Sequence, residues 1–335
     1  MNQILTTHRV LQFKDYLAKE ESCSLIERST SLPTEGQVLV KMSFAPINPS
    51  DLMFIRGLYG IKKKLPFIGG FEGSGIIVAT GSSRFQVGDR VAVVAGLSDG
   101  TWAEYMLTSE DSCILLEPDL SLEQGAMLFV NPLTCYAMFH KATETKTNAI
   151  VQTAGASALG KMLNRLAKKK GFPVINVVRK EKQEEVLKEL GAEYILNSEK
   201  ESFQKEFYKL TKKLNASFLI DAVGGELTTK LIPLLPLNST ILIYGNLSEK
   251  DFSVSPGILI FQNKKIEGFW LSTWIRCLEI EKFQSIAREV QNLYPECFSS
   301  QVNKIFPLET GYQALEFYKK NMTEGKILFS MEKNS

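Results

Sequence analysis

Alternation of strand-like and helix-like segments between residues 148 and 244 most constrains how this chain can fold. Short apolar runs, typical of buried strands, take turns there with amphipathic runs, typical of helices. Such alternation favours a parallel sheet with helices on both faces. The expected strands span residues 148–153, 173–178, 194–196, 218–222 and 240–244, and the expected helices span 159–170, 182–190, 203–213 and 226–234. We therefore expect a doubly wound α/β domain in this part of the chain.

The first third of the chain has a different texture. Residues 37–43, 75–79 and 89–94 read as short strands, and glycines and prolines separate them. This β-rich pattern is typical of a partly open barrel or a sandwich. Helix-like segments at 281–293 and 310–321 and a short strand at 326–331 follow the alternating region. These last segments could return to the N-terminal part, which would give one domain two separate pieces.

The first strand-helix junction has the small residues of a phosphate-binding turn. Gly155, Ala156, Ser157, Ala158 and Leu159 follow a strand and open a helix. Small side chains let backbone amides approach a pyrophosphate, and the helix N-terminus supplies free N–H groups and partial positive charge. The middle glycine of the G-x-G-x-x-G pattern is replaced, and such turns also pack helices onto strands without a ligand. The position of the turn at the start of the alternating region nevertheless predicts dinucleotide binding.

The end of the second expected strand indicates which dinucleotide binds. An NAD site places an acidic residue there, which holds the ribose hydroxyls. Here the strand ends in Arg179 and Lys180, and no acid precedes Glu181. A guanidinium group suits a 2′-phosphate, although an arginine at a strand end can also be merely solvated. We therefore predict NADPH as the cofactor.

Charge and cysteine usage exclude several classes of function. The 335 residues include 39 basic and 37 acidic side chains, and a net charge of +2 removes the main electrostatic argument for nucleic-acid binding. The 5 cysteines are scattered, so we expect a reducing compartment and no disulfide framework. With 2 histidines and no cluster of cysteine or histidine, we predict no metal site.

The sequence shows neither a membrane segment nor a secretory signal. No apolar run approaches the roughly 18 residues of a membrane helix, and the N-terminus lacks the pattern of a secretory signal. We therefore expect a cytoplasmic protein without a membrane partner.

The motifs of both regions resemble those of the medium-chain dehydrogenase/reductase superfamily. Residues 66–75, which read PFIGGFEGSG, and residues 87–91, which read VGDRV, match signatures of its first domain. Zinc-dependent members carry a ligand cysteine at the position of Asn48 and a ligand histidine at that of Phe71, and their four-cysteine lobe is missing here. The resemblance implies a zinc-independent oxidoreductase that reduces an activated double bond or a quinone, since alcohol oxidation needs a Lewis acid or its equivalent. It also implies a Rossmann NADPH-binding domain at 124–272 and a GroES-like catalytic domain formed by 1–123 and 273–335.

Within the zinc-free branch, the chain resembles the mitochondrial-type trans-2-enoyl thioester reductases. Four segments carry this resemblance, at 47–60, 100–102, 130–136 and 268–274, and the third is shared with quinone reductases. The implied reaction is NADPH-dependent reduction of the C2=C3 double bond of a 2-enoyl thioester on coenzyme A or an acyl carrier protein. The alternative is an NADPH:quinone oxidoreductase of the same superfamily. Phe261, Phe269 and Trp270 also fit a strand that would pair across a homodimer, as is usual in the superfamily.

The resemblance further implies roles for individual residues. Tyr59 matches the active-site tyrosine, which would donate a proton or position a water. Alternatively, Tyr59 could simply pack at a glycine-rich turn. Asn48 could offer an amide donor to the substrate, or it could cap the turn before its proline. The implied cofactor-binding residues are Asn131, Thr134, Gly155, Ala156, Ser157, Ala158, Leu159, Arg179, Lys180, Tyr244, Gly245, Asn246, Leu247, Phe269, Trp270, Leu271, Ser272 and Lys326.

Two features leave alternatives open. The run Lys62-Lys63-Lys64 could meet the phosphates of coenzyme A or an acidic carrier protein, but such a run is usually a solvated loop. A nucleotide-binding protein without catalysis is a further possibility for the whole chain. The Tyr59 loop, Asn131 and the tryptophan segment at 268–274 argue against it together, because a protein without catalysis would be free to lose them.

Overall fold

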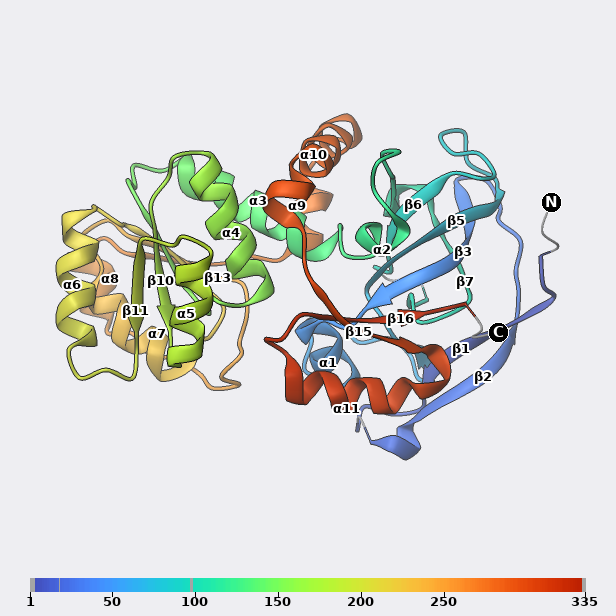
Figure 1. The fold of residues 1–335 in the computed structure, drawn as a ribbon, viewed down its shortest axis with the longest axis horizontal. Coiled ribbons are helices and arrows are strands. Elements are labelled where there is room, and N and C mark those ends of the chain that lie inside the picture. Colours follow the sequence, from blue (N-terminus) through green and yellow to red (C-terminus); the bar gives the residue numbers. More distant parts are fainter. Residues whose placement is uncertain (1–3, 18, 97–98, 333–335) are drawn as a thin grey trace. The chain divides into compact units, whose positions relative to one another are not determined.

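The computed structural model describes residues 4–17, 19–96 and 99–332, and the chain divides into two compact units (Figure 1). The first unit holds Met1–Asn131, Ile280–Tyr294 and Ser299–Ser335, and the second holds Pro132–Glu279 and Pro295–Phe298. The two main boundaries, at 131/132 and 279/280, therefore fall eight and seven residues later than those predicted at 123/124 and 272/273. Residues up to 131 stay with the first unit because Glu72 of that unit accepts the backbone N–H groups of Phe129 and Val130, at 3.1 and 2.8 Å.

The second unit is built on a parallel sheet whose order, among the described residues, is β11-β10-β9-β12-β13-β14. Its strands are β9 (Ile150–Thr153), β10 (Val174–Val178), β11 (Tyr194–Asn197), β12 (Phe218–Asp221), β13 (Thr240–Ile243) and β14 (Lys265–Gly268). The intervening helices are α4 (Ala158–Lys169), α5 (Glu181–Glu189), α6 (Phe203–Lys213), α7 (Gly225–Leu231) and α8 (Pro256–Phe261). The chain winds outward from β9 to β11 and then returns to start again at β12. This is the doubly wound order of a dinucleotide-binding sheet, so the predicted fold class is confirmed.

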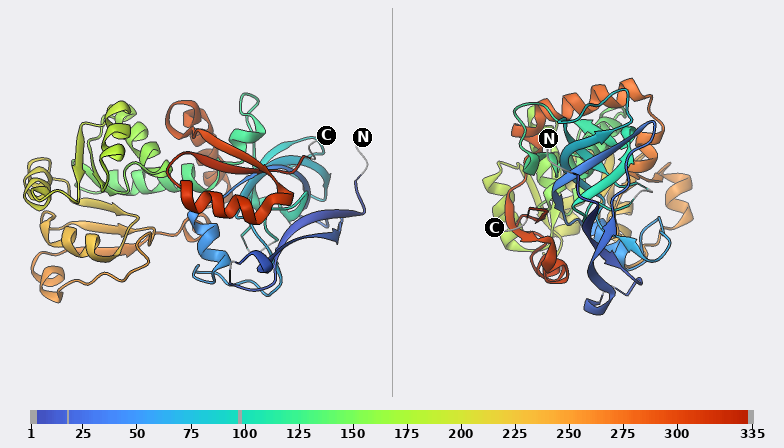
Figure 2. Two further views of the ribbon diagram at one scale, coloured as in Figure 1. Left: turned by 60° about the horizontal axis from the view of Figure 1, so that its bottom comes forward. Right: turned by 90° about the vertical axis from the view of Figure 1, so that its right-hand side faces the viewer.

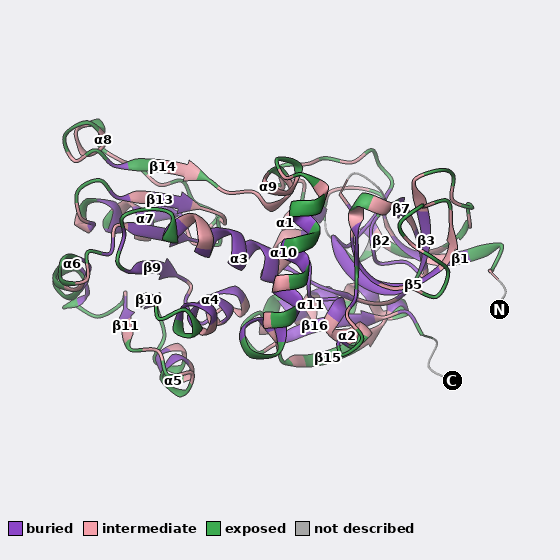
Figure 3. Ribbon diagram, turned by 90° about the horizontal axis from the view of Figure 1, so that it is seen from above, coloured by how far each residue is buried: buried purple, intermediate pink, exposed green. Residues whose placement is uncertain are grey.

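Helices cover both faces of this sheet because its strands are apolar on both sides. Val177 of β10 joins a core with Phe207 of α6 and Leu231 of α7. The next residue, Val178, packs on the other face with Leu187 of α5. Successive side chains of a strand point to opposite faces, and a strand covered by helices on both faces is buried throughout. Figure 3 shows β9 as buried along its length.

The first unit is a β structure that uses strands from both ends of the chain. Among the described residues, its larger sheet has the order β15-β16-β3-β5-β6-β8, with β7 also paired to β3, and a smaller sheet has the order β2-β1-β4. Strand β16 pairs antiparallel with β3, so the C-terminal segment completes the N-terminal sheet (Figures 1 and 2). The strands are β1 (Thr7–Phe13), β2 (Cys23–Ser29), β3 (Gln37–Pro46), β4 (Phe67–Ile68), β5 (Glu72–Thr80), β6 (Arg90–Val94), β7 (Tyr105–Ser109), β8 (Cys113–Leu115), β15 (Val302–Pro307) and β16 (Lys326–Ser330).

The remaining helices lie between these strands along the chain. They are α1 (Pro49–Ile55), α2 (Leu122–Gly125), α3 (Val130–Thr143), α9 (Leu271–Arg276), α10 (Ile280–Leu293) and α11 (Gly311–Asn321). Short 3-10 turns lie at Glu20–Ser22, Glu110–Ser112, Ile232–Leu234 and Leu308–Thr310, and Tyr294–Phe298 forms a π-helical turn. Within the described ranges, no helix has both the length and the apolar character needed to span a membrane.

A fully buried tryptophan explains the glycine-rich motif of the first unit. The indole of Trp102 packs against Phe329, with ring centroids 5.2 Å apart, and against Phe13, with centroids 6.0 Å apart. A Cβ atom on Gly69 would lie 2.3 Å from this indole, and one on Gly70 would lie 2.5 Å from it. The motif therefore needs glycine because the tryptophan ring rests directly on its backbone.

The strand expected to contain Phe261, Phe269 and Trp270 is wrong in its extent. Phe261 is the last residue of α8 and is 84% exposed. Asn263, with a φ of 48°, turns the chain after this helix. The strand that follows is the polar segment β14, which pairs parallel with β13, and Phe269 and Trp270 come after its end. A left-handed residue after the helix thus separates Phe261 from the strand.

Candidate active site

A buried hydrogen-bonded network surrounds Asn48 in the first unit. Asn48 precedes α1, Glu72 begins β5 and Lys326 begins β16, so the sheet brings together three distant parts of the sequence. Asn48 Nδ2 donates to Glu72 Oε1 at 2.8 Å, and Lys326 Nζ donates to Asn48 Oδ1. The three residues are 1%, 0% and 4% exposed, respectively. The carboxamide of Asn48 is therefore held at its nitrogen by a carboxylate and at its oxygen by an amino group.

The other carboxylate oxygen of Glu72 is also fixed. Glu72 Oε2 accepts the backbone N–H groups of Phe129 and Val130 at the start of α3. The first N–H groups of a helix lack partners within the helix and favour negative charge. Burial raises the pKa of Glu72, whereas Lys326 and these hydrogen bonds act to lower that pKa. Every described contact of this carboxylate is thus with a donor.

Asp51 adds a second carboxyl group to the network. Its Oδ2 accepts the backbone N–H of Asn48 at 2.7 Å, while its buried Oδ1 has no hydrogen-bond partner among the described residues. Burial raises the pKa of Asp51 to about 7. Burial also lowers the pKa of Lys326, and the two carboxyl groups oppose that change. Asp51 can therefore take up or lose a proton near neutral pH.

Tyr59, the predicted proton donor, lies on the loop that follows α1. Its ring packs against Phe71, with centroids 4.8 Å apart, and Phe71 packs against Phe54, with centroids 5.1 Å apart. Gly57, with a φ of 68°, turns the chain so that the loop runs back over this aromatic cluster. Tyr59 is half-buried, whereas Phe71 is buried. One part of the tyrosine is anchored and another part reaches solvent, so packing and a chemical role are compatible here.

In the second unit, the predicted phosphate-binding turn joins β9 to α4. Ser157 Oγ caps the helix by accepting the N–H of Gly160 at 3.0 Å. Ala154 has a φ of 52°, and a Cβ atom on Gly155 would lie 2.7 Å from Asn176 Oδ1. The turn is therefore closely packed against Asn176, and small side chains surround the free N–H groups at the start of the helix. This arrangement fits the pyrophosphate of a nicotinamide dinucleotide.

Three buried amide side chains support this turn, and sequence reasoning missed them. Gln152 and Asn164 both donate to Asn176 Oδ1, at 2.6 and 2.7 Å. They also donate to the carbonyl oxygen of Gly160, at 3.0 and 2.9 Å. The signal that could have found them is an amide residue inside each of two apolar strands and on the buried face of an amphipathic helix.

A buried aspartate organises the neighbouring strand end, and it was also missed. Asp221 Oδ1 accepts from Thr153 Oγ1 at 2.6 Å, which links the ends of β9 and β12. Asp221 Oδ2 accepts from Gly224 N at 3.1 Å and from Thr228 Oγ1 at 2.5 Å. Ligands of open α/β sheets bind outside the carboxyl ends of the strands where the strand order reverses, and that point lies here. An acid that ends an apolar strand and precedes two glycines was the available signal.

The other predicted cofactor residues of this unit lie at the same edge of the sheet. Arg179 and Lys180 follow β10 and are exposed, and their backbone N–H groups both donate to Gln183 Oε1, at 3.1 and 3.2 Å. Glu181 begins α5, where a carboxylate suits the helix N-terminus. The residues after β13 are Tyr244, Gly245, Asn246 and Leu247, and those after β14 are Phe269, Trp270, Leu271 and Ser272.

Three predicted cofactor residues lie elsewhere. Asn131 and Thr134 belong to α3, with Asn131 in the first unit and Thr134 in the second. Lys326 lies in the Asn48 network of the first unit. Across the described parts of the chain, no group of three histidine, cysteine, aspartate or glutamate residues is placed to hold a metal ion. The absence of a metal remains a prediction.

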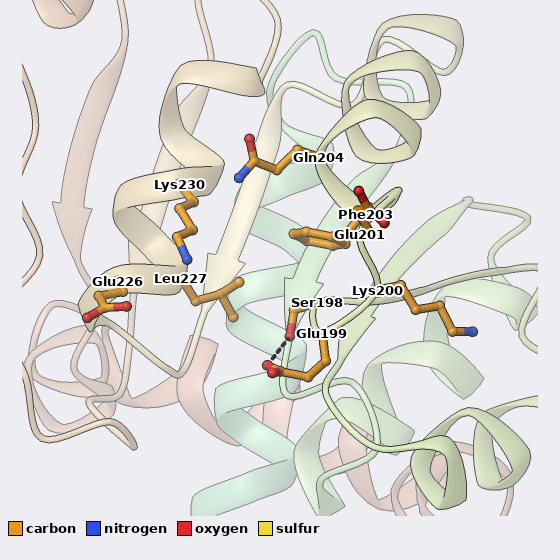
Figure 4. A pocket seen from close by; sticks show the side chains of 9 residues that line it. All are labelled: Ser198, Glu199, Lys200, Glu201, Phe203, Gln204, Glu226, Leu227 and Lys230. Atoms are coloured by element: carbon orange, nitrogen blue, oxygen red, sulfur yellow. Dashed lines mark hydrogen bonds between the residues drawn. The ribbon is translucent and has the colours of Figure 1, made fainter.

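A cavity of about 360 Å³ lies at the end of β11, beside α6 and α7 (Figure 4). Its lining includes acidic and basic residues, and Ser198 Oγ donates to Glu199 Oε1 at 3.4 Å. It contains none of the predicted site residues. Its lining is Ser198, Glu199, Lys200, Glu201, Phe203, Gln204, Glu226, Leu227 and Lys230.

Comparisons with known proteins agree with this arrangement. The family model described as "Zinc-binding dehydrogenase" matches residues 158–291, and the one described as "Alcohol dehydrogenase GroES-like domain" matches residues 34–118. The enoyl-[acyl-carrier-protein] reductase, mitochondrial, of Rattus norvegicus is 34% identical over 305 residues, which covers 88% of this chain and 81% of that protein. A putative NADPH:quinone reductase from Mesorhizobium loti has 34% identity and a TM-score of 0.89, with 98% of this chain and 99% of that chain covered.

A third structure, a complex of Etr1p with NADP and crotonyl-CoA, has a TM-score of 0.81 and covers 97% of this chain and 100% of that chain. At 24% identity this likeness shows the fold alone. The fold and both family models define an oxidoreductase of the medium-chain dehydrogenase/reductase superfamily. Within that superfamily, the chain belongs to the family of the enoyl-[acyl-carrier-protein] reductases called mitochondrial. The predicted superfamily is thus confirmed, and the family implies a nicotinamide dinucleotide cofactor.

Proposed function

We propose that this protein uses NADPH to reduce the C2=C3 double bond of 2-enoyl thioesters. The enoyl-[acyl-carrier-protein] reductase of Rattus norvegicus, 34% identical over 81% of its own length, supports this activity. The reaction places a hydride on C3 and a proton on C2, and negative charge develops on the thioester oxygen in between. The protein must therefore orient two reactants, stabilise an oxyanion and supply a proton.

The second unit would hold the cofactor, which when bound supplies the hydride. The N–H groups at the start of α4 would hold its pyrophosphate, since Ser157 caps that helix and the surrounding residues are small. The exposed side chains of Arg179 and Lys180 would bind the 2′-phosphate. The residues that follow β13 and β14 would contact the rest of the dinucleotide.

The first unit would supply the polar groups that act on the thioester. The observation that carries the proposal is what occupies the two positions where zinc-dependent relatives have metal ligands. Asn48 there is a buried amide held by Glu72 and Lys326, and Phe71 is part of an aromatic cluster with Tyr59. We propose that hydrogen bonds from Asn48 and Tyr59 stabilise the developing charge without zinc, and that Tyr59 donates the proton or positions the water that does.

The first test measures NADPH oxidation with a trans-2-enoyl-CoA and, in parallel, with a simple quinone. A clear preference for the thioester, with NADH much poorer than NADPH, supports the proposal. Turnover of the quinone alone would overturn it and would leave Tyr59 as a wall of the pocket. No turnover of either substrate, with NADPH still bound, would favour a binding protein without catalysis.

Replacing Tyr59 by phenylalanine separates the two enzyme classes. With an enoyl-CoA we expect kcat to fall by about 10²- to 10⁴-fold, because one positioned acid is lost. A quinone reductase should barely change, since the oxygens of a quinone can take protons from solvent. The matched control is Tyr16→Phe, which removes another phenol hydroxyl. Tyr16 packs against Phe54 of the same aromatic cluster, and its Oη donates to the carbonyl oxygen of Lys63 at 2.7 Å.

The second candidate is an NADPH:quinone oxidoreductase. The specific observation in its favour is the Mesorhizobium loti structure, a putative NADPH:quinone reductase that is 34% identical over 98% of this chain. The parallel assay distinguishes it directly. Asn131 and Thr134 do not help the choice, because their segment is common to both classes.

Three further expectations stay proposals. Analytical ultracentrifugation tests whether the protein is a homodimer. Comparing turnover of carrier-bound and coenzyme A-bound substrate tests whether an acyl carrier protein is a partner. Cell fractionation tests the cytoplasmic location. The run Lys62-Lys63-Lys64 is where we would expect an acidic carrier to make contact. Reversing these charges should then weaken the binding of the carrier-bound substrate more than that of the coenzyme A-bound substrate.

A further inference from the structure

We propose that Glu72 and Lys326 are positioning residues that lock the Asn48 carboxamide in one orientation for the reaction. The inference rests on the proposed function, in which Asn48 donates a hydrogen bond to the reacting thioester. It gives a role to Glu72, which no motif reasoning singled out. It also gives Lys326 a role different from the cofactor contact that the family resemblance implies.

The chemistry of the two partners allows only one orientation of the amide. An ammonium group can only donate, and an ionised carboxylate can only accept. Lys326 Nζ therefore requires the oxygen of Asn48, while Glu72 Oε1 requires its nitrogen, and the observed contacts match this. An exposed asparagine can turn its amide over at little cost. Asn48 cannot, because a flip would set donor against donor and acceptor against acceptor in a buried site.

The clamp also leaves one donor of the amide available. The carboxamide nitrogen carries two hydrogens, and among the described residues its acceptor is Glu72. Its second hydrogen has a direction set by the locked amide plane. The Lys326 ammonium on the carbonyl oxygen polarises the amide, which makes that hydrogen a stronger donor. A donor fixed in advance stabilises developing negative charge without reorganisation during the reaction.

Glu72 can act as an anchor because its own position is fixed. Its second oxygen accepts two backbone N–H groups, from Phe129 and Val130, so the carboxylate cannot rotate without losing both. These two residues directly precede Asn131, which is predicted to contact the nicotinamide half of the cofactor. The same carboxylate thus ties the Asn48 amide to the start of α3.

Glu72→Gln gives a sharp prediction, because a neutral amide cannot do both tasks. If its oxygen turns to the two backbone donors, its nitrogen faces Asn48 and sets donor against donor there. If its oxygen turns to Asn48, its nitrogen faces the N–H groups of Phe129 and Val130. We therefore expect this nearly isosteric change to loosen the Asn48 amide, with a fall in kcat of about 10-fold or more.

A double-mutant cycle tests whether Lys326 acts through Asn48. The variants are Asn48→Ala, Lys326→Met and the two combined, and the readouts are kcat and the Kd of NADPH by fluorescence titration. We expect Lys326→Met to lower kcat by about 10-fold or more in the natural background and by less than about 3-fold in the Asn48→Ala background. The Kd of NADPH should change by less than about 3-fold. Additive effects on kcat, or a raised Kd of NADPH with kcat unchanged, would overturn the proposal. The raised Kd would instead support a contact between Lys326 and the cofactor.

A second readout does not depend on activity. In protein labelled with ¹⁵N-asparagine, the side-chain signals of Asn48 are identified by their loss in Asn48→Ala. We expect these amide protons to exchange slowly in the natural protein and rapidly in Lys326→Met and Glu72→Gln. Unchanged exchange in both variants would overturn the proposal even if activity falls. If neither substrate is turned over, the proposed function fails, and the exchange result still decides whether the clamp exists.

The matched control for stability is Gln291→Met. Gln291 is another buried amide of the first unit, where it accepts Glu117 N at 2.9 Å and donates to the carbonyl oxygen of Leu115 at 3.1 Å. Its loss should lower stability without changing the exchange of Asn48 or the coupling in the cycle. If Gln291→Met changes both to the same extent as Lys326→Met, the Asn48 effects are general consequences of weaker packing, and the proposal is wrong.

Discussion

At the scale of single residues, the first unit buries the side chains of Asp51, Glu72 and Lys326, and residues of these types are almost never fully buried unless they are paired. Glu72 and Lys326 compensate each other through Asn48, which leaves Asp51 as a carboxyl group without a counter-charge of its own. A buried charge is costly unless it is paired, so the cluster is most stable when Asp51 carries a proton. This arrangement couples the protonation of one residue to folding.

Replacing Asp51 by asparagine should therefore change how stability depends on pH. The folded-state pKa of about 7 lies above the ordinary value of 3.8, so the folded protein binds this proton more tightly than the unfolded chain does. The stabilisation is complete below about pH 4 and is lost as pH rises through 7. Relative to Asp51→Asn, the natural protein should lose on the order of 3 kcal/mol of unfolding free energy across that range.

Urea unfolding at several pH values measures this difference. The control is Asp119→Asn, which changes an exposed aspartate of the same unit and should not alter the pH dependence. A difference between the natural protein and Asp51→Asn that stays constant from acidic to neutral pH would contradict the prediction.

Arg179 offers a second prediction at this scale, on cofactor choice. A guanidinium that binds a 2′-phosphate contributes about 1.5–3 kcal/mol, so Arg179→Ala should weaken NADPH binding by about 10- to 100-fold. NADH lacks that phosphate and should bind as before. Steady-state kinetics with both cofactors measure the change, and Lys188→Ala, an exposed lysine in the last turn of α5, is the control. Equal losses for NADPH and NADH would remove Arg179 from the 2′-phosphate site.

At the scale of elements, the turn between β9 and α4 makes opposite demands on two adjacent residues. Ala154 occupies a left-handed conformation that favours glycine, whereas Gly155 has an ordinary φ but no room for a side chain. We expect Ala154→Gly to be neutral or to stabilise by up to about 1 kcal/mol. Gly155→Ala should destabilise by about 1–3 kcal/mol, since it pushes against the hydrogen-bonded amide of Asn176.

Chemical unfolding of the two variants checks this pair, and each serves as the control for the other. The same change of one methyl group is made at neighbouring positions, in opposite directions. Destabilisation by Ala154→Gly together with tolerance of Gly155→Ala would show that the turn is built differently. NADPH affinity should follow the same order, because the N–H groups of α4 depend on this turn.

Elements with strong local patterns were predicted closely. In the second unit, helix α6 spans the predicted residues 203–213, and the strands β9 to β13 lie within about two residues of their predicted bounds. Their apolar runs and amphipathic periods are local properties of the sequence. Strands β1, β2 and β15 were not predicted. Polar residues interrupt the apolar residues of β1, and β2 and β15 are largely exposed, so none of them shows a clear apolar run; each is held by pairing with a neighbouring strand of its sheet.

At the scale of the whole molecule, cofactor binding and folding are linked. Any ligand that binds the folded form alone raises stability by an amount set by its concentration relative to Kd, about 2.7 kcal/mol at 100 times Kd. NADPH should therefore raise the Tm of the transition that unfolds the second unit. NADH at the same concentration should raise this Tm less, and Arg179→Ala should reduce the NADPH effect. Differential scanning calorimetry measures these shifts, and equal shifts with both cofactors would contradict the prediction.

The sequence by itself determined the parts of this protein that depend on neighbours along the chain. The strand-helix alternation, the small residues from Gly155 to Leu159 and the cations Arg179 and Lys180 all lie in one continuous stretch. Their meaning follows from periodicity and from rules for helix termini, which are local. The parallel sheet then places them at one edge, because the carboxyl ends of parallel strands lie on the same side.

Only the tertiary structure decided the network around Asn48. Residues 48, 72 and 326 meet because β3 pairs with both β5 and β16, and that pairing joins the two ends of the chain. No periodicity indicates which buried acid faces which buried amine. The hydrogen-bonding needs of buried polar groups explain the contacts once the strands are in place, but the strand order that brings the groups together is a property of the whole fold.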